Sequence, residues 1–389
     1  MSQLSFLDKL LDGVEVEWRE LGSTIDFRRG KRLIKSQLTE SGEYAVYQNS
    51  MTPLGYYHLS NVSAKSVFVI CAGAAGEIGF SDDDFWAADD VYYAEKSEIL
   101  DSKYLYHFLL TQKYKIASQV RRASIPRLSK SAIDKLIIPI PCPNNPEKSL
   151  AIQAEIVRIL DTFTELTIEL TIELNARKQQ YNHYRDQLLT FEEGEVEWKT
   201  LGEIAEYSKD RISFEILDET NYVGVDCLLQ NRAGKTLSKH VPNSGNSTKY
   251  NVGDILIGNI RPYLKKIWYA DCSGGTNGDV LVVRPTAPQI NSRYLYQVLA
   301  DDKFFEYNMR YAKGAKMPRG NKPKILEYLV PIPSKAEQAR IVTTLDKFDA
   351  LTNSITEGLP REIELRQKQY EYYRDLLLSF PKPSDEKAA

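Results

Sequence analysis

The strongest constraint on the fold is a long apolar stripe that surrounds a repeated four-residue unit. Thr-Ile-Glu-Leu occurs at 167–170 and again at 171–174, after a related Thr-Glu-Leu at 164–166. The apolar positions recur mostly at spacings of three and four: Ile152, Ile156, Ile159, Phe163, Leu166, Leu170, Leu174, Tyr181, Tyr184, Leu188 and Phe191. Such spacing is typical of a helix that packs along another helix. Because no Pro or Gly interrupts residues 149–191, we predict one helix of roughly 60 Å there.

A second segment matches this one and supplies the predicted partner helix. Residues 366–380 (RQKQYEYYRDLLLSF) match 177–191 (RKQQYNHYRDQLLTF), and 341–348 match 156–163. The second segment has four more residues between the matched blocks, the length of one repeat unit. Gly358-Leu359-Pro360 interrupts its stripe and predicts a kink or break, because Pro disrupts a helix interior. We expect an antiparallel pair about a pseudo-twofold axis; two ordinary core helices are the alternative.

Shorter repeats indicate that the regions between the helices are also duplicated. The matching segments are 16–22 and 196–202, 102–106 and 292–296, and 138–141 and 330–333. The order is therefore globular unit, long helix, globular unit, long helix. The predicted boundaries are 1–148 and 194–334 for the globular units, 149–193 and 335–381 for the spacer helices, and 382–389 for a tail. Each unit mixes short β-like runs with a helix, so we expect an α/β (α+β) fold in both.

The two units match at their edges and differ in the middle. Residues 44–57 (YAVYQNSMTPLGYY) have no counterpart in residues 222–235 (YVGVDCLLQNRAGK). Different interiors within a repeated frame suggest two related scaffolds that recognise two different targets. Neutral drift in loops is the alternative.

Composition and motifs exclude several classes of protein. No apolar run is long enough for a membrane helix, and residues 1–18 lack the pattern of a signal peptide. The four cysteines are scattered, which favours reduced thiols and a cytoplasmic location. We find no methyltransferase Asn-Pro-Pro-Tyr or Asp-Pro-Pro-Tyr motif, no complete P-loop and no histidines spaced like metal ligands. The sequence therefore predicts no catalytic site and no metal site.

Positive charge gathers in the globular units, although the net charge of the chain is −3. Five bases and no acid occur within residues 28–35, and a second acid-free basic stretch surrounds Pro126. The second unit has basic clusters at 261–266 and 313–324, with Tyr263 and Tyr311 among them. The helix segment 147–173, in contrast, has six acids and two bases. A basic run is usually a solvated face, but its presence in loops of both repeated units favours DNA binding.

The order of segments and the helix motifs resemble the specificity subunit of type I restriction–modification enzymes. The Thr-x-Glu-Leu repeats, the segments 177–181 and 184–189, and the segment 357–370 (EGLPREIELRQKQY) resemble the type IC subgroup. The resemblance implies two target-recognition domains held apart by an antiparallel helix pair, each reading one half of a split site in double-stranded DNA. It also implies that two methylation subunits and motor–nuclease restriction subunits are partners. S-adenosylmethionine, ATP and magnesium would then belong to those partners, and this chain would have no cofactor and no catalysis of its own. A single-chain DNA methyltransferase and a non-specific DNA-binding scaffold are the alternatives.

Two sets of candidate site residues follow from this interpretation. Basic, amide and tyrosine side chains in loops are candidates for DNA contacts: Lys31, Arg32, Gln48, Asn49, Tyr57, Arg122, Arg127, Arg261, Tyr263, Lys265, Asn277, Lys316 and Arg319. Polar side chains expected on the outer faces of the helices are candidates for docking the methylation subunits: Arg177, Gln180, Asn182, Arg185, Arg366, Gln369, Glu371 and Arg374.

The repeat unit also predicts how far apart the two half-sites lie. Two domains that reach the major groove on one face of a duplex have half-site centres about 10 base pairs apart. With half-sites of three or four base pairs, which the resemblance implies, the unread spacer is about six or seven. A four-residue unit lengthens a helix by roughly 6 Å, so we expect the repeat to set the spacer.

Overall fold

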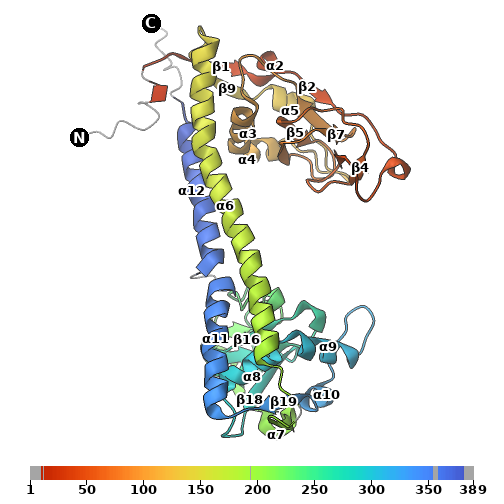
Figure 1. The fold of residues 1–389 in the computed structure, drawn as a ribbon, viewed down its shortest axis with the longest axis vertical. Coiled ribbons are helices and arrows are strands. Elements are labelled where there is room, and N and C mark those ends of the chain that lie inside the picture. The colour runs from red at the N-terminus through yellow and green to blue at the C-terminus, as the bar shows by residue number, and fades with distance from the viewer. Residues whose placement is uncertain (1–9, 12, 193, 354–357, 381–389) are drawn as a thin grey trace, which may run out of the picture. The chain divides into compact units, whose positions relative to one another are not determined.

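The computed structural model describes residues 10–11, 13–192, 194–353 and 358–380. The chain divides into two compact units (Figure 1). Unit 1 contains Met1–Thr167 and Arg366–Ala389, and unit 2 contains Ile168–Leu365. The predicted tail, 382–389, lies outside the described residues.

The central sheet of unit 1 has four antiparallel strands, whose two faces support two apolar clusters. Its order is β2 (Phe27–Arg29), β8 (Val91–Ala94), β5 (Ser66–Ile70) and β6 (Ile78–Ser81). Side chains alternate along a strand, so Val67 and Val69 face helix α3 (Ser102–Thr111) while Phe68 and Ile70 join a second cluster. The second cluster lies against a small sheet of β4 (Gly55–Tyr57), β3 (Tyr44–Tyr47) and β7 (Phe85–Ala87).

Unit 2 repeats this topology, which confirms the predicted duplication and mixed α and β fold. Its central sheet has the order β11 (Ala205–Tyr207), β18 (Val280–Pro285), β15 (Ile255–Gly258) and β16 (Ile267–Tyr269). Helix α8 (Ser292–Leu299) takes the place of α3. The small sheet is built differently, from β12 (Arg211–Ser213), β14 (Asn246–Tyr250), β17 (Gly274–Thr276) and β13 (Tyr222–Val223). Both small sheets retain one parallel pair, β3 with β7 and β13 with β17.

The short repeated motifs form a second shared framework. The segments 16–22 and 138–141 contribute to the two-stranded sheet of β1 (Val16–Glu20) and β9 (Ile137–Pro141). Their repeats contribute to β10 (Glu197–Thr200) and β19 (Leu329–Ile332). A buried tyrosine joins each two-stranded sheet to the neighbouring helix. The Tyr104 hydroxyl of α3 donates to the Pro139 carbonyl of β9 (2.9 Å), and the Tyr294 hydroxyl of α8 donates to the Pro331 carbonyl of β19 (3.0 Å). The remaining elements are α2 (Leu21–Thr24), η1 (Lys35–Gln37), α4 (Lys113–Ser118), α5 (Lys130–Asp134), α7 (Leu201–Ile204), η2 (Phe214–Ile216), η3 (Gln230–Arg232), η4 (Pro262–Leu264), α9 (Asp302–Arg310) and α10 (Lys322–Leu326).

The predicted first long helix is α6 (Pro146–Leu188), a single helix of 43 residues. It begins at a proline, which suits the first turn because the backbone N–H that proline lacks would have no hydrogen-bond partner within the helix there. The second long segment contains two helices, α11 (Lys335–Asn353) and α12 (Gly358–Leu377). Gly358-Leu359-Pro360, at which the sequence predicts a kink or break, forms the start of α12, and Gly358 has a positive φ of 76°. Residues 354–357 lie outside the described residues.

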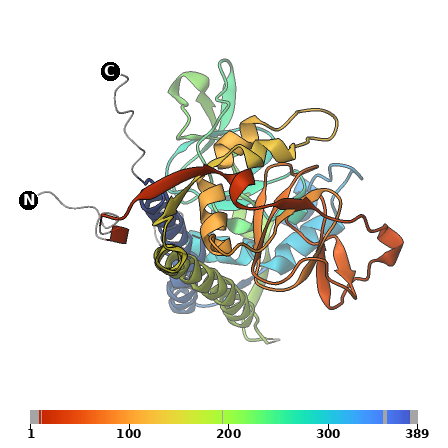
Figure 2. The same cartoon turned by 90° about the horizontal axis from the view of Figure 1, so that it is seen from above.

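Within each unit, aromatic stacking joins α6 to a second long helix. In unit 1, where α6 and α12 lie side by side (Figures 1 and 2), Phe163 stacks on Tyr373 with ring centroids 5.1 Å apart. In unit 2, Tyr181 and Tyr184 both stack on Phe348 of α11. Leu160, absent from the predicted stripe, is fully buried, because α6 packs on both a globular domain and another helix and so needs a wider apolar face.

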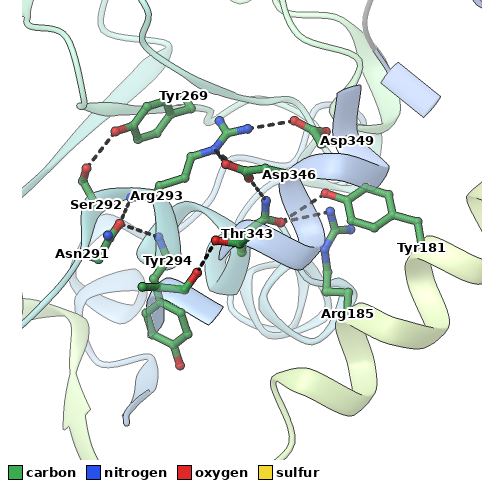
Figure 3. Close-up of polar contacts among 12 residues, drawn as sticks. Tyr181, Arg185, Tyr269, Asn291, Ser292, Arg293, Tyr294, Thr343, Asp346 and Asp349 are labelled. Carbon is green, nitrogen blue, oxygen red and sulfur yellow. Dashed lines mark hydrogen bonds and ion pairs between the residues drawn. The ribbon is translucent and has the colours of Figure 1, made fainter. Parts of the chain in front are cut away.

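A half-buried polar network joins α8 to the long helices of unit 2 (Figure 3). The Asp346 carboxylate on α11 accepts hydrogen bonds from Arg293 (2.9 Å) and Gln297 (2.9 Å), both on α8. Gln297 in turn accepts a hydrogen bond from the Tyr181 hydroxyl of α6 (3.2 Å), and Arg293 also reaches Asp349 (3.0 Å). One carboxylate and one amide therefore join three helices.

Unit 1 contains the matching network at the matching positions. Lys103 of α3 donates to Asp161 of α6 (2.8 Å), and Nδ1 of His107 lies 2.8 Å from the Tyr370 hydroxyl of α12. Burial raises the pKa of Asp161, but the neighbouring His107 and Lys103 side chains outweigh it and hold that pKa below its ordinary value. The repeated Leu-Asp-x-Phe segment of the sequence thus marks where each globular domain attaches to its helices.

We predict that Asp346→Ala destabilises unit 2 by about 2–3 kcal/mol, because two donors on α8 lose a charged acceptor in a half-buried site. The matched control is Thr343→Ala on the same helix, whose exposed hydroxyl donates to the Ala339 carbonyl within α11. Urea denaturation of the full chain measures both, and the control is expected to shift the free energy of unfolding by less than about 0.5 kcal/mol. Equal effects of the two substitutions would contradict the role given to the network.

Candidate nucleic-acid interface

A short basic hairpin follows the α4 region of unit 1, and we call residues 121–127 hairpin 1. Its ends pair through the backbone: Arg121 N donates to Arg127 O (2.9 Å), and Arg127 N donates to Arg121 O (3.1 Å). The hairpin is anchored to the loop after β5, where Gly73 N donates to the Pro126 carbonyl (3.1 Å) and Leu128 N to the Cys71 carbonyl (2.8 Å). Each of these anchoring bonds joins backbone atoms only.

Residues 313–319 form the equivalent hairpin in unit 2, which we call hairpin 2. Lys313 and Arg319 exchange the same two backbone hydrogen bonds, at 2.9 and 2.8 Å. Arg261 N donates to the Pro318 carbonyl (2.7 Å), as Gly73 does to Pro126. Both hairpins therefore end in Pro-Arg, are rich in bases and hold the same place beside the central sheet. They present the exposed candidates Arg122, Arg127, Lys316 and Arg319.

The candidates from the divergent part of unit 1 lie near hairpin 1. The Asn49 carbonyl accepts a hydrogen bond from Ala74 N (2.9 Å), one residue from the glycine that anchors the hairpin. Gly73 has a φ of +83°, and a Cβ there would lie 2.7 Å from the Asn49 carbonyl oxygen, so the close approach requires glycine. The structure thus brings Gln48, Asn49 and Arg127 into one region.

A second group in unit 1 is centred on Trp86. Its indole nitrogen donates to the Lys31 carbonyl (2.8 Å), and its ring contacts the ring of Tyr57 edge to face at 5.2 Å. The end of β7 joins this group to β3. The Lys31 amide donates to the Ala87 carbonyl, and the Ala88 amide donates to the Tyr47 carbonyl, both at 2.9 Å. Arg32 follows in the same exposed segment. The two groups therefore meet around residues 87–88.

In unit 2, Asp279 organises the neighbourhood of hairpin 2. Its carboxylate accepts from Arg319 (2.5 Å), its amide donates to the side chain of Asn277 (3.1 Å), and its carbonyl accepts from Asn259 N (2.8 Å). Arg261 has a positive φ of 52°, a conformation that costs a non-glycine residue free energy and is frequent at functional sites. Tyr263 follows in η4 with its side chain exposed. These candidates are therefore brought together beside hairpin 2.

Lys265 is engaged elsewhere. Its ammonium group lies 2.8 Å from the Asp302 carboxylate, and burial, followed by the charge of Arg232, lowers its pKa. Arg232 was absent from the sequence candidates, as were Trp86 and Asp279. The shared Pro-Arg ends of the two hairpins were visible in the sequence, but no local pattern marks Arg232, which reaches Asp302 from η3.

The docking candidates fall into equivalent pairs on the two helices. Arg177 donates to Gln180 on α6 (2.8 Å), and Arg366 donates to Gln369 on α12 (2.9 Å). Asn182 and Glu371 are exposed. Arg185 does not lie on an outer face as expected: its side chain is buried against Tyr181 and Gln297 of its own unit. Arg374 is largely buried as well, beside the Tyr370 ring.

Metal binding and membrane crossing each require a recognisable arrangement of residues. No cluster of three or more His, Cys, Asp or Glu side chains placed to hold a metal ion occurs among the described residues. No helix within the described ranges is long and apolar enough to cross a membrane.

Comparisons with known proteins agree on one family. A family model described as the type I restriction modification DNA specificity domain matches residues 13–177 and again 193–365. The specificity subunit of the type I restriction enzyme EcoR124I/EcoR124II of Escherichia coli is 39% identical, over 98% of this chain and 99% of that protein. The EcoprrI specificity subunit of the same organism is 31% identical, over 92% of this chain and 93% of that protein.

Solved structures share the fold. The S subunit of the type I restriction–modification system of M. genitalium has a TM-score of 0.60 at 18% identity, covering 96% of this chain and 98% of that one. A chain from a structural study of complex assembly and conformational transition in the type I R-M system has a TM-score of 0.57 at 14% identity, covering 93% and 97%.

Proposed function

Because the chain belongs to the type I restriction–modification DNA specificity family, we propose that each of its two units reads one half of a bipartite DNA site. Its role as a DNA sequence-specificity subunit follows from that membership. The observation that carries the finer proposal is the pair of equivalent basic hairpins, each anchored by equivalent backbone hydrogen bonds beside the central sheet of its own unit. Because each unit has one such hairpin, each unit is expected to contact one half-site.

The chemistry of the two neighbourhoods supports both affinity and specificity. Exposed cations on the hairpins suit phosphate contacts, which fix the position of a protein on the duplex. The residues beside them differ: Gln48 and Asn49 in unit 1, and Arg261 and Asn277 in unit 2. Amide side chains pair well with adenine and arginine with guanine, so different neighbours favour different half-site sequences.

We propose that methylation and cleavage take place on other subunits and that this chain contributes no catalytic group. S-adenosylmethionine, ATP and Mg²⁺ would then bind those subunits. The enzyme alternative, a single-chain methyltransferase, requires measurable affinity of the isolated chain for the methyl donor. The scaffold alternative requires equal affinity for random and target DNA. Methyl-donor titration and competition binding separate these three functions.

We also propose that the helices dock two methylation subunits. Support comes from the matched Arg–Gln pairs on α6 and α12, which would offer two similar surfaces to two identical partners. The expected stoichiometry is two methylation subunits for each specificity chain, because the two surfaces are equivalent. Mass measurement of the reconstituted complex tests this, and one partner for each chain would contradict the symmetrical arrangement.

We predict that Arg261→Ala and Arg319→Ala weaken DNA binding in two distinguishable ways. Loss of a base contact costs about 1–3 kcal/mol at one base position, whereas loss of a phosphate contact weakens all sequences alike and reduces the salt slope by about one. Competition binding of the assembled complex to single-base variants of its target measures both. Lys335→Ala, at an exposed lysine on α11, is the matched control and should leave binding unchanged. If affinity and salt slope both survive the two arginine substitutions, these residues do not contact DNA.

We predict that a third Thr-Ile-Glu-Leu, inserted after Leu174, widens the unread spacer by about one base pair. The insertion lengthens α6 by roughly 6 Å. One base-pair step is about 3.4 Å, and tilt and twist absorb part of the change. Mapping of methylated adenines in cells that carry the complete complex measures the spacer and both half-sites. The half-site sequences should be unchanged because the hairpins lie outside the inserted segment; a constant spacer would refute the idea.

A further inference from the structure

A cationic cavity lies within unit 2, between the C-terminal part of α6 and the segments around η3 and α9. Its volume is about 310 Å³. Six of the side chains that line it are Lys178, Asn182, Arg185, Arg232, Lys265 and Asp302. Lys178 and Asn182 are exposed on α6, while Arg185 is buried. The cavity thus extends from the surface to a buried guanidinium.

The guanidinium of Arg185 is buried without a neutralising acid. Its side chain is 2% exposed and stacks over the Tyr181 ring at 4.0 Å. Its one hydrogen bond, to the Gln297 amide oxygen, is long at 3.4 Å, and Nε has no partner among the described residues. No described carboxylate lies within ion-pair distance of it. A buried charge that lacks a partner is costly, so this arrangement favours an anion from outside the chain.

The equivalent arginine of unit 1 has an acidic partner, so the lack of one at Arg185 is not a general property of the repeat. Arg374 donates two hydrogen bonds to the adjacent Asp375 carboxylate, at 2.7 and 2.9 Å. Asp186 is the corresponding neighbour of Arg185, but its carboxylate pairs with Lys303 instead, at 2.6 Å. The local sequence is the same in both helices, yet only Arg185 is left without an acid.

Arg232 adds a second guanidinium to the cavity. Both Asn231 and Arg232 have positive φ angles, 53° and 65°, so the backbone is strained where it presents this side chain. Arg232 and Lys265 share the single carboxylate of Asp302. Burial, followed by the charge of Arg185, lowers the pKa of Arg232 to about 10, as expected where one guanidinium group lies near another in a buried site.

The neighbouring acids reduce this excess of positive charge without removing it, since Asp301 and Glu306 act on the cations of the cavity but five basic side chains line the two hollows against four acidic ones. An adjacent hollow of about 340 Å³ is also lined by Asp186, Asp301 and Glu306. Asp186 is held by Lys303, and the Asp301 side chain accepts the Lys303 amide at the start of α9 (2.8 Å). In the cavity itself, four cationic side chains face one carboxylate. A doubly charged anion balances such a site better than a single carboxylate does.

We propose that this cavity binds a phosphate-type oxyanion between Arg185 and Arg232, with Lys178 and Asn182 at its entrance. Guanidinium groups present planar pairs of donors that match the oxygens of phosphate and sulfate. A water molecule occupies about 30 Å³, so the cavity has room for such an ion with several waters. The oxyanion is either free phosphate or a backbone phosphate of nucleic acid, and the same side chains would bind both.

Titration of inorganic phosphate into the full chain, followed calorimetrically in chloride buffer at constant ionic strength, tests the proposal. We expect saturable binding that weakens by about tenfold or more in Arg185→Lys and Arg232→Lys, because charge-assisted hydrogen bonds are lost. Sulfate should bind similarly and acetate much more weakly. Arg374→Lys is the matched control in the other repeat and should bind phosphate as the unsubstituted chain does.

Lys178→Gln keeps the test decisive if the buried substitutions prevent folding, since this exposed change also removes one cation from the site. Absence of saturable binding, or equal phosphate affinity in Lys178→Gln and the unsubstituted chain, overturns the proposal.

A short DNA duplex separates the two sources of the oxyanion. If phosphate competes with duplexes of any sequence and Lys178→Gln weakens them all, the site takes a backbone phosphate. If neither added phosphate nor Lys178→Gln changes duplex binding, the cavity binds the free phosphate ion. Either result leaves the assignment of half-sites to the hairpins untouched.

Discussion

In each unit, an aspartate on a long helix accepts polar contacts from the globular domain, and the orientation of the domain on the helix depends on these contacts together with apolar packing. Asp346 in unit 2 and Asp161 in unit 1 receive their donors from the helix that also covers the central sheet. A fully buried glutamine completes the attachment in both units. Gln338 accepts a hydrogen bond from the Asn291 amide before α8 (2.8 Å), and Gln153 accepts one from the Asp101 amide before α3 (2.9 Å). Directional bonds of this kind define one orientation of a domain on a helix, which apolar packing alone leaves less well defined.

Hydrophobic spacing accounted for much of the fold but not for this attachment. The length of α6, the interruption before α12 and the duplication of the domains follow from periodicity and from repeated segments. Periodicity sorts positions into apolar and polar, so Gln153, Arg185 and Gln338 read as surface residues although they are buried. The wrong expectation for Arg185 and the omission of Leu160 have the same cause. A helix that packs on two neighbours buries a wider arc than its stripe reveals.

The candidate DNA-binding residues illustrate another limit of sequence reasoning. Acid-free basic runs located the segments that form the hairpins, because local charge can be read directly from the sequence. The contacts between hairpins and the loops beside them are non-local, and they depend on strand order. Gly73 and Arg261 occupy equivalent positions although one is glycine and the other is not. Only the shared backbone hydrogen bonds to Pro126 and Pro318 reveal that equivalence, and no pattern within either segment predicts it.

The way in which the hairpins are held bears on how such a protein can evolve. The proline carbonyl and the paired main-chain groups provide the anchorage, and the side chains of residues 122–125 and 315–317 take no part in those bonds. Substitution at these tips can therefore alter the chemistry offered to a ligand while the loop keeps its place. A lineage can in this way explore new preferences by single replacements, in one repeat at a time, without passing through an unfolded intermediate form.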